Sequence, residues 1–227
     1  MYFDYYYLIL VVPALLLSLY AQVKVKSTFA KYSKINTQRG ITGKEAAKLL
    51  MRTNGISDVG IQQVAGSLTD HYDPASKMLK LSEPVYDKTS ISAVGVAAHE
   101  TGHAIQDKER YAPLVLRSTL VPLANIGSSA GPYLAMAGII FSMDILLTIG
   151  IILFSVAVLF YIVTLPVEID ASRRALKVLE SNAVLSQEEL RGARKVLTAA
   201  ALTYIASALT AVASLLRLIL IARNRRK

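Results

Sequence analysis

One long hydrophobic segment constrains the fold of this chain more than any other feature. Residues 120–165 are nearly all apolar, and a Gly-Pro pair at 131–132 and Asp144 interrupt them. A helix needs about 20 apolar residues to cross a bilayer, so this segment is long enough for two crossings. We predict transmembrane helices near 119–141 and 145–165. A mean hydropathy of +0.43 and a hydrophobic content of 53% agree, because both are high for an ordinary soluble domain.

Two further segments are apolar enough to enter a membrane. Residues 1–22 are aromatic and aliphatic, and they contain Asp4 but no Lys or Arg. A cleaved signal peptide usually begins with basic residues, so a retained anchor is favoured. Residues 198–216 are apolar and rich in Ala. They form either a fourth span or a buried helix, because a fourth crossing would leave the basic tail 223–227 outside, against the positive-inside tendency.

The basic residues indicate a membrane partner and not a nucleic acid. The chain has 25 Lys and Arg against 16 Asp and Glu, and many of them lie beside the hydrophobic segments. Such juxtamembrane charge is typical of cytoplasmic flanks and anionic lipid surfaces. No nucleic-acid-binding motif is present, so the lipid bilayer is the expected partner. Residues 23–117 and 166–197 are both rich in Lys and Arg, and we expect them to share the cytoplasmic side.

A short motif, His-Glu-x-x-His, carries the chemistry of the chain. His99 and His103 are four residues apart, so on a helix they lie on one face, and Glu100 directly follows the first of them. Two imidazoles at this spacing suit zinc, and the carboxylate can take a proton from a metal-activated water. The motif also occurs by chance on solvated helices. Here the surrounding residues 91–105 are apolar, so we expect the two histidines to be buried. Burying polar groups without partners is costly, and this favours a metal ion as their partner.

A catalytic zinc site needs a third protein ligand. The chain has no Cys, which also excludes disulfides, and His71 is its only other His, so a carboxylate is the natural choice. Glu168 is favoured because it follows a predicted span that returns the chain to the side of the motif. We expect a new helix to open at Pro166, with Glu168 in its first turn. Glu83 and Glu109 are alternatives nearer the motif.

Local patterns predict the elements around the motif. Thr42 and Glu45 form a capping box for a helix that ends at Asn54-Gly55. Residues 59–64 and 77–81 are β-like, and a turn-forming stretch, 70–76, separates them, which predicts a hairpin or meander. The alternation over 77–82 is typical of a half-buried edge strand, with which an extended peptide could pair. Ser90 and Ser186 are the expected N-caps of later helices, the first running from 91 to about 107.

Several of these motifs resemble the YugP-like neutral zinc metallopeptidases. The resemblance rests on His71-Tyr72-Asp73-Pro74, on the stretch 97–106, on Pro166–Arg173 and on the order of the hydrophobic segments, and it covers most of the chain. It implies a mainly α, integral membrane protein of the prokaryotic cell membrane with three to four transmembrane helices. Its gluzincin-like core would contain the HExxH helix, a Glu helix and a small β-hairpin or sheet.

The resemblance also implies roles for single residues. His99, His103 and Glu168 would bind Zn²⁺, and Glu100 would be the general base. Related membrane gluzincins often read E-x-x-A-D at the Glu helix, whereas here Ser172 stands in the last place. The carboxylate that would orient the first histidine is therefore missing or replaced by Ser172.

These expectations divide the chain into five parts. They are a transmembrane anchor (1–22), a cytoplasmic part of the peptidase domain with the motif helix (23–117), a transmembrane hairpin (118–165), a second peptidase part with Glu168 (166–197), and a C-terminal hydrophobic helix with a basic tail (198–227).

The predicted function is a zinc-dependent endopeptidase that cleaves proteins or peptides, including membrane proteins, at the membrane surface. The oxyanion of the reaction needs a donor, and His71, Tyr72, Arg173 and Arg174 are candidates. His71 is equally well interpreted as a turn histidine bonded to the backbone. The alternative function is a non-catalytic membrane scaffold in which zinc clamps two helices. That alternative requires a closed site with a fourth ligand, such as His71 or Asp170.

Overall fold

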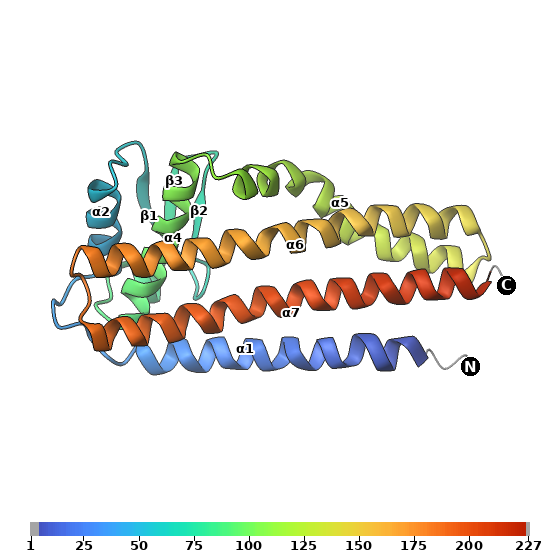
Figure 1. Cartoon of the computed structure of the whole chain (residues 1–227), viewed down its shortest axis with the longest axis horizontal. Coiled ribbons are helices and arrows are strands. Elements are labelled where there is room, and N and C mark those ends of the chain that lie inside the picture. The colour runs from blue at the N-terminus through green and yellow to red at the C-terminus, as the bar shows by residue number, and fades with distance from the viewer. Residues whose placement is uncertain (1–4, 226–227) are drawn as a thin grey trace. The chain divides into compact units, whose positions relative to one another are not determined.

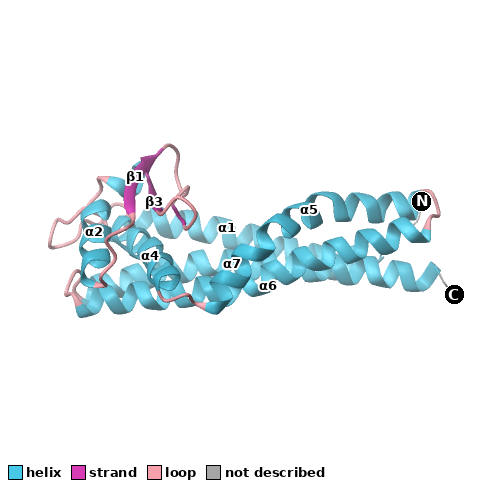
Figure 2. Ribbon diagram, turned by 90° about the horizontal axis from the view of Figure 1, so that it is seen from above, coloured by secondary structure: helices cyan, strands magenta, loops and turns pink. Residues whose placement is uncertain are grey.

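The computed structural model describes residues 5–225. It shows a mainly helical protein (Figures 1 and 2). The helices are η1 (Tyr7–Val11, a π-helical turn), α1 (Val12–Tyr32), α2 (Gly43–Thr53), α3 (Glu83–Tyr86), α4 (Ile91–Lys108), α5 (Ala112–Ile140), α6 (Asp144–Ser181) and α7 (Gln187–Arg225). The strands are β1 (Gly60–Val64), β2 (His71–Asp73) and β3 (Met78–Ser82).

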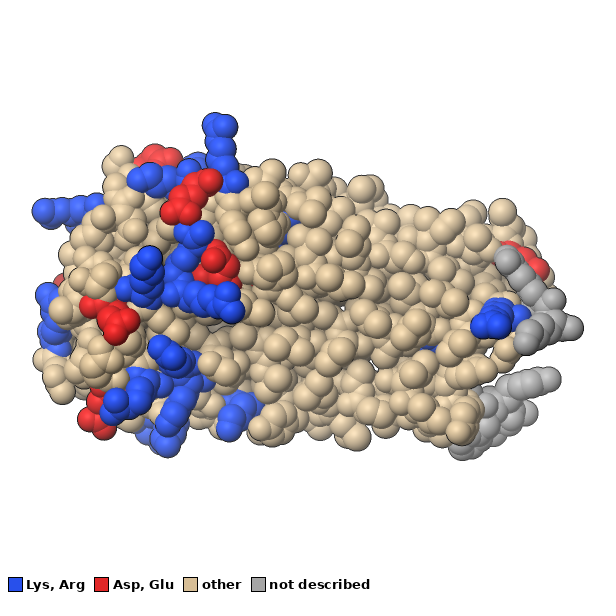
Figure 3. Space-filling view, in the orientation of Figure 1, with Lys and Arg blue, Asp and Glu red and all other residues tan. Residues whose placement is uncertain are grey.

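The chain forms two compact units. Unit 1 contains the N-terminal segment up to Gln22, Val115–Pro166 and the segment from Thr203 onward. Unit 2 contains Val23–Leu114 and Val167–Leu202. On the face drawn in Figure 3, Lys, Arg, Asp and Glu side chains gather on unit 2, and few lie on unit 1.

Three helices are long and apolar enough to cross a membrane, judged by length and composition. They are Tyr7–Tyr32, Asp144–Ser181 and Gln187–Asn224. Helix α5, in which we predicted a span near 119–141, is not one of the three. Two prolines and polar residues such as Asn125 and Ser128 lower its hydropathy. The span in α5 and the five-part division of the chain therefore stay predictions.

Glycines bring α5 and α6 into close contact inside unit 1. A Cβ atom added to Gly138 would lie 2.3 Å from the backbone nitrogen of Leu147, and one added to Gly150 would lie 2.4 Å from that of Ala135. Small residues at such positions let the backbones of membrane helices approach each other closely. The break between the two helices that we predicted near 119–141 and 145–165 is confirmed, because α5 ends at Ile140 and α6 begins at Asp144.

The expected helix start at Pro166 is wrong. Helix α6 continues from Asp144 to Ser181 with Pro166 inside it, so Glu168 lies within a long helix and not in a first turn. An interior proline costs about 3 kcal/mol in a solvated helix. It is tolerated in membrane-type helices, where neighbouring helices and polar side chains can satisfy the freed backbone group.

The small sheet of unit 2 has the strand order β1-β3-β2, and this corrects two expectations. Strand β3 lies in the centre and not at an edge, because β1 pairs with it in parallel and β2 pairs with it in antiparallel orientation. Strand β2 lies inside the stretch that we expected to be only a turn. Asp70 fixes it there, since its carboxylate accepts hydrogen bonds from the backbone N–H (2.7 Å) and the hydroxyl (2.8 Å) of Ser82 at the end of β3.

The core of unit 2 surrounds α4. Helix α2 packs on α4 and begins with the predicted capping box, in which Glu45 N–H donates to the Thr42 hydroxyl and the Thr42 N–H donates to the Glu45 carboxylate. Ser90 is the N-cap of α4, as predicted. Fully buried side chains fill the space between these elements; they include Leu50, Leu79, Leu81, Val85, Val94, Leu179 and Val196. Burial of this apolar surface holds α4 rigidly in place.

Candidate metal centre

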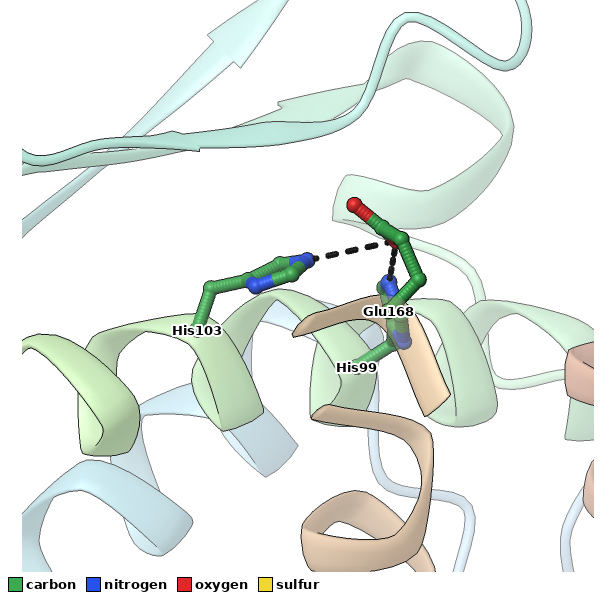
Figure 4. A group of neighbouring side chains, drawn as sticks. All are labelled: His99, His103 and Glu168. Atoms are coloured by element: carbon green, nitrogen blue, oxygen red, sulfur yellow. Dashed lines mark hydrogen bonds and ion pairs between the residues drawn. The ribbon is translucent and has the colours of Figure 1, made fainter. Parts of the chain in front are cut away.

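Helices α4 and α6 meet at a glycine in the motif. A Cβ atom added to Gly102 would lie 2.5 Å from the carbonyl oxygen of Ala171, so the two backbones nearly touch there. Side chains on either side of this contact therefore face one another across a short gap. On α4 these are the two histidines of the motif, and on α6 the facing side chain is Glu168 (Figure 4).

The two imidazoles and the carboxylate converge on one point. Glu168 Oε2 lies 3.2 Å from His99 Nε2 and 3.6 Å from His103 Nε2. Their potential ligand atoms all lie within 4.8 Å of one another. The structure thus brings together the three residues that we expected to bind zinc, and the group is positioned to bind a metal ion.

The dimensions of this group fit zinc. Bonds of 2.0–2.1 Å in a tetrahedral site place the donor atoms about 3.3 Å apart, which is close to the separations between the Glu168 oxygen and each histidine, while all three donors lie within 4.8 Å of one another. Glu168 is only 2% exposed, and a buried carboxylate needs a compensating positive charge. Nitrogen and oxygen donors without thiolates are also the usual set of a catalytic zinc site.

Each histidine is held from behind by a polar side chain. His99 Nδ1 lies 3.1 Å from Ser172 Oγ, so Ser172 contacts the first histidine of the motif. His103 Nδ1 lies 3.0 Å from Gln106 Oε1. Sequence reasoning did not assign Gln106. Its position could have indicated a role beside the histidine, because it is an uncharged polar residue one turn after His103 on an apolar helix.

Glu100 lies beside the group in a buried position. Burial raises the pKa of its carboxyl to about 7, against the lowering effect of the His99 charge. The backbone of Tyr72 in β2 also lowers the pKa of this carboxyl, by a smaller amount. A carboxyl whose pKa lies near neutrality is suited to accept a proton and to release it again.

The other candidates lie outside the group of three. His71 is exposed at the start of β2, and its Nδ1 lies 2.9 Å from the carbonyl oxygen of Thr69, as in the turn interpretation. The Tyr72 hydroxyl donates a hydrogen bond to Asp107 (2.7 Å). Burial and this hydrogen bond raise the pKa of the Tyr72 hydroxyl.

The remaining charged candidates are engaged elsewhere or exposed. Arg174 pairs with Glu109 (2.6 Å) and with Asp170. Arg173 and Glu83 are exposed.

The close contact at Gly102 leads to a testable prediction. We expect Gly102→Ala to destabilise the fold by about 1–3 kcal/mol, because the methyl group must push α4 and α6 apart. Thermal unfolding in detergent measures this. Gly95→Ala is the matched control on the same helix, since its Cβ would lie 3.4 Å from the Cβ of Ala193, an ordinary contact. Equal unfolding temperatures for the two variants would contradict the close approach.

Comparisons with known proteins agree with this centre. Residues 7–223 match the family described as "Putative neutral zinc metallopeptidase". The chain is 47% identical over 220 residues to "Putative membrane protease YugP" of Bacillus subtilis (strain 168), covering 97% of this chain and 98% of that protein. No solved structure gives a significant match.

Proposed function

The chain belongs to the family described as "Putative neutral zinc metallopeptidase", and on that premise we propose that it is a membrane-bound endopeptidase with zinc as its cofactor. The observation that carries the proposal is the convergence of His99, His103 and Glu168 beside the buried carboxyl of Glu100. A third donor from a second helix, α6, further supports a gluzincin-like core for unit 2.

The residues of the site divide the chemistry among them. His99, His103 and Glu168 would hold zinc, which when bound supplies a Lewis acid that polarises a peptide carbonyl and acidifies water. Glu100 accepts a proton from the attacking water and later donates it to the leaving amine.

The scaffold alternative is less well supported. It requires a closed site with four protein ligands, whereas catalytic sites keep one position open. Within residues 5–225 the metal-binding group contains three residues, and neither His71 nor Asp170 is among them. The Oδ2 atom of Asp170 is already bonded to Gln106 and Arg174.

Purified protein in detergent tests the proposal directly. We expect one zinc ion per chain and cleavage of casein or of a membrane-protein substrate. Zinc without cleavage of any substrate would favour the scaffold.

We propose that the chain is integral to the membrane, which is supported by its three long apolar helices and by its similarity to "Putative membrane protease YugP". We propose that unit 2 lies on the cytoplasmic side of a prokaryotic cell membrane and that proteins or peptides are cleaved at the membrane surface. The Lys- and Arg-rich composition of 23–114 and 167–202 supports this orientation.

The orientation can be tested with single cysteines, because the natural chain has none. We expect a membrane-impermeant maleimide to label Ser142→Cys, in the exposed turn before α6, on intact cells. Ser67→Cys, exposed between β1 and β2, should be labelled only after the membrane is opened. The unsubstituted chain is the background control. Labelling of Ser67→Cys on intact cells would overturn the assignment.

A further inference from the structure

Gln106 is a fully buried polar side chain on α4, one turn after His103. Its amide makes three contacts. Its Oε1 lies 3.0 Å from His103 Nδ1, and its Nε2 donates to the carbonyl oxygen of Val167 (2.8 Å) and to the carboxylate of Asp170 (2.8 Å). Both N–H groups and the oxygen of the amide are therefore used.

The partners of Gln106 allow only one orientation of its amide. A carbonyl oxygen and a carboxylate only accept hydrogen bonds, so the amide NH₂ must face Val167 and Asp170. The amide oxygen then faces His103, and it also only accepts. Nδ1 of His103 must therefore carry the hydrogen, which in a neutral ring leaves the lone pair on Nε2. Nε2 is the atom that faces Glu168.

An ion pair fixes the carboxylate end of this arrangement. Asp170 accepts a short hydrogen bond from Arg174 Nε, and Arg174 Nη1 also donates to Glu109 (2.6 Å). A guanidinium only donates, so the direction of the hydrogen bonds cannot reverse anywhere between Arg174 and His103.

The other histidine is held less strictly. The hydroxyl of Ser172 both donates and accepts, so its contact with His99 Nδ1 does not by itself select a tautomer. The two motif histidines thus differ in how firmly their ring hydrogens are placed.

We propose that Gln106 is a positioning residue, which fixes the tautomer and the ring orientation of His103 so that Nε2 is presented to the zinc ion, with Asp170 and Arg174 fixing the amide. The inference rests on the metal site of the proposed function. It does not require that the protein cleave peptides.

The first test compares two buried substitutions on α4. Gln106→Leu removes the amide, whereas Thr101→Val removes an equally buried hydrogen bond, from Thr101 Oγ1 to the carbonyl oxygen of Ala97. We expect Gln106→Leu to weaken zinc affinity about 10- to 100-fold, the usual effect of losing a partner of a metal-bound histidine. Thr101→Val should stay within about twofold of the natural chain. Competition with a chelating dye in detergent measures both. Equal affinities for the two variants would overturn the proposal.

A second test covers the case in which Gln106→Leu does not fold. Asp170→Ala alters a partly exposed side chain and removes one of the two acceptors that orient the Gln106 amide, so that only the carbonyl oxygen of Val167 still opposes its rotation. We expect it to weaken zinc affinity several-fold. It should also give a mixture of His103 tautomers in the ¹⁵N spectrum of the zinc-free full-length protein at high pH, where the natural chain shows hydrogen on Nδ1 alone. The chain has three histidines, so their signals can be assigned. Unchanged affinity together with an unchanged tautomer would refute the inference.

The two proposals fail in different ways. If the protein binds zinc but cleaves nothing, the peptidase proposal is refuted. Zinc affinity and the His103 tautomer still decide the role of Gln106. If the Gln106→Leu variant cleaves normally and binds zinc as tightly as the natural chain, only the inference about Gln106 is refuted.

Discussion

Replacing Glu100 by glutamine is expected to lower proteolysis about 10³-fold and to leave zinc binding intact. A general base contributes typically 10²–10⁴-fold to a rate, and glutamine cannot accept the proton of the attacking water. The amide has nearly the same shape as the carboxyl, so the packing of this buried side chain between α4 and β2 is kept. Initial rates of casein cleavage and the zinc content of the same preparations measure the two effects together.

The matched control for this experiment is Glu83→Gln. Glu83 is also an acid of unit 2, and it was a candidate for the third ligand, but it is exposed in the first turn of α3. We expect its substitution to change neither the rate nor the zinc content. If Glu100→Gln cleaved casein at the natural rate, another group would be the base. A loss of zinc in Glu100→Gln would instead indicate that Glu100 holds the metal site together.

The predictable part of the site is the part that local geometry determines. His99 and His103 face the same way because they are one helical turn apart, and Ser90 marks where that helix begins. The capping box at Thr42 is equally local, because all of its hydrogen bonds connect residues within one turn. Glu168 was identified from the order of the segments and from a family resemblance. That choice survives although the helix start expected at Pro166 is wrong, because α6 continues through the proline and still carries the carboxylate to α4.

Features that depend on distant partners could not be predicted. Strand β2 has only three residues, and Asp70, which secures it, has its partner twelve residues later at Ser82. The alternation over β3 shows that one side is buried, but it does not reveal that a parallel strand, β1, covers the second edge. Gln106 is similar: a glutamine in an apolar helix has no evident role until Asp170 and Val167, more than sixty residues away, are brought beside it.

Removing the carboxylate of α6 is the second substitution with a large expected effect. We expect Glu168→Ala to weaken zinc affinity more than about 100-fold, because loss of a partner that only supports a ligand already costs 10- to 100-fold. Two imidazoles on one helix then remain, which is fewer than the three protein ligands of a catalytic zinc site. Proteolysis should fall with the zinc content, in contrast to Glu100→Gln, in which the metal stays. Titration of the zinc-free protein against a chelating dye gives the affinity.

The control for this substitution is Glu180→Ala, which removes an exposed carboxylate farther along the same helix. It should leave both zinc affinity and cleavage unchanged. If Glu168→Ala kept the natural affinity, the ion would be bound without α6, and the contact between α4 and α6 at Gly102 would serve packing alone. The combination of zinc loss in Glu168→Ala with zinc retention and lost cleavage in Glu100→Gln is therefore decisive, because it separates a ligand of the metal from the base.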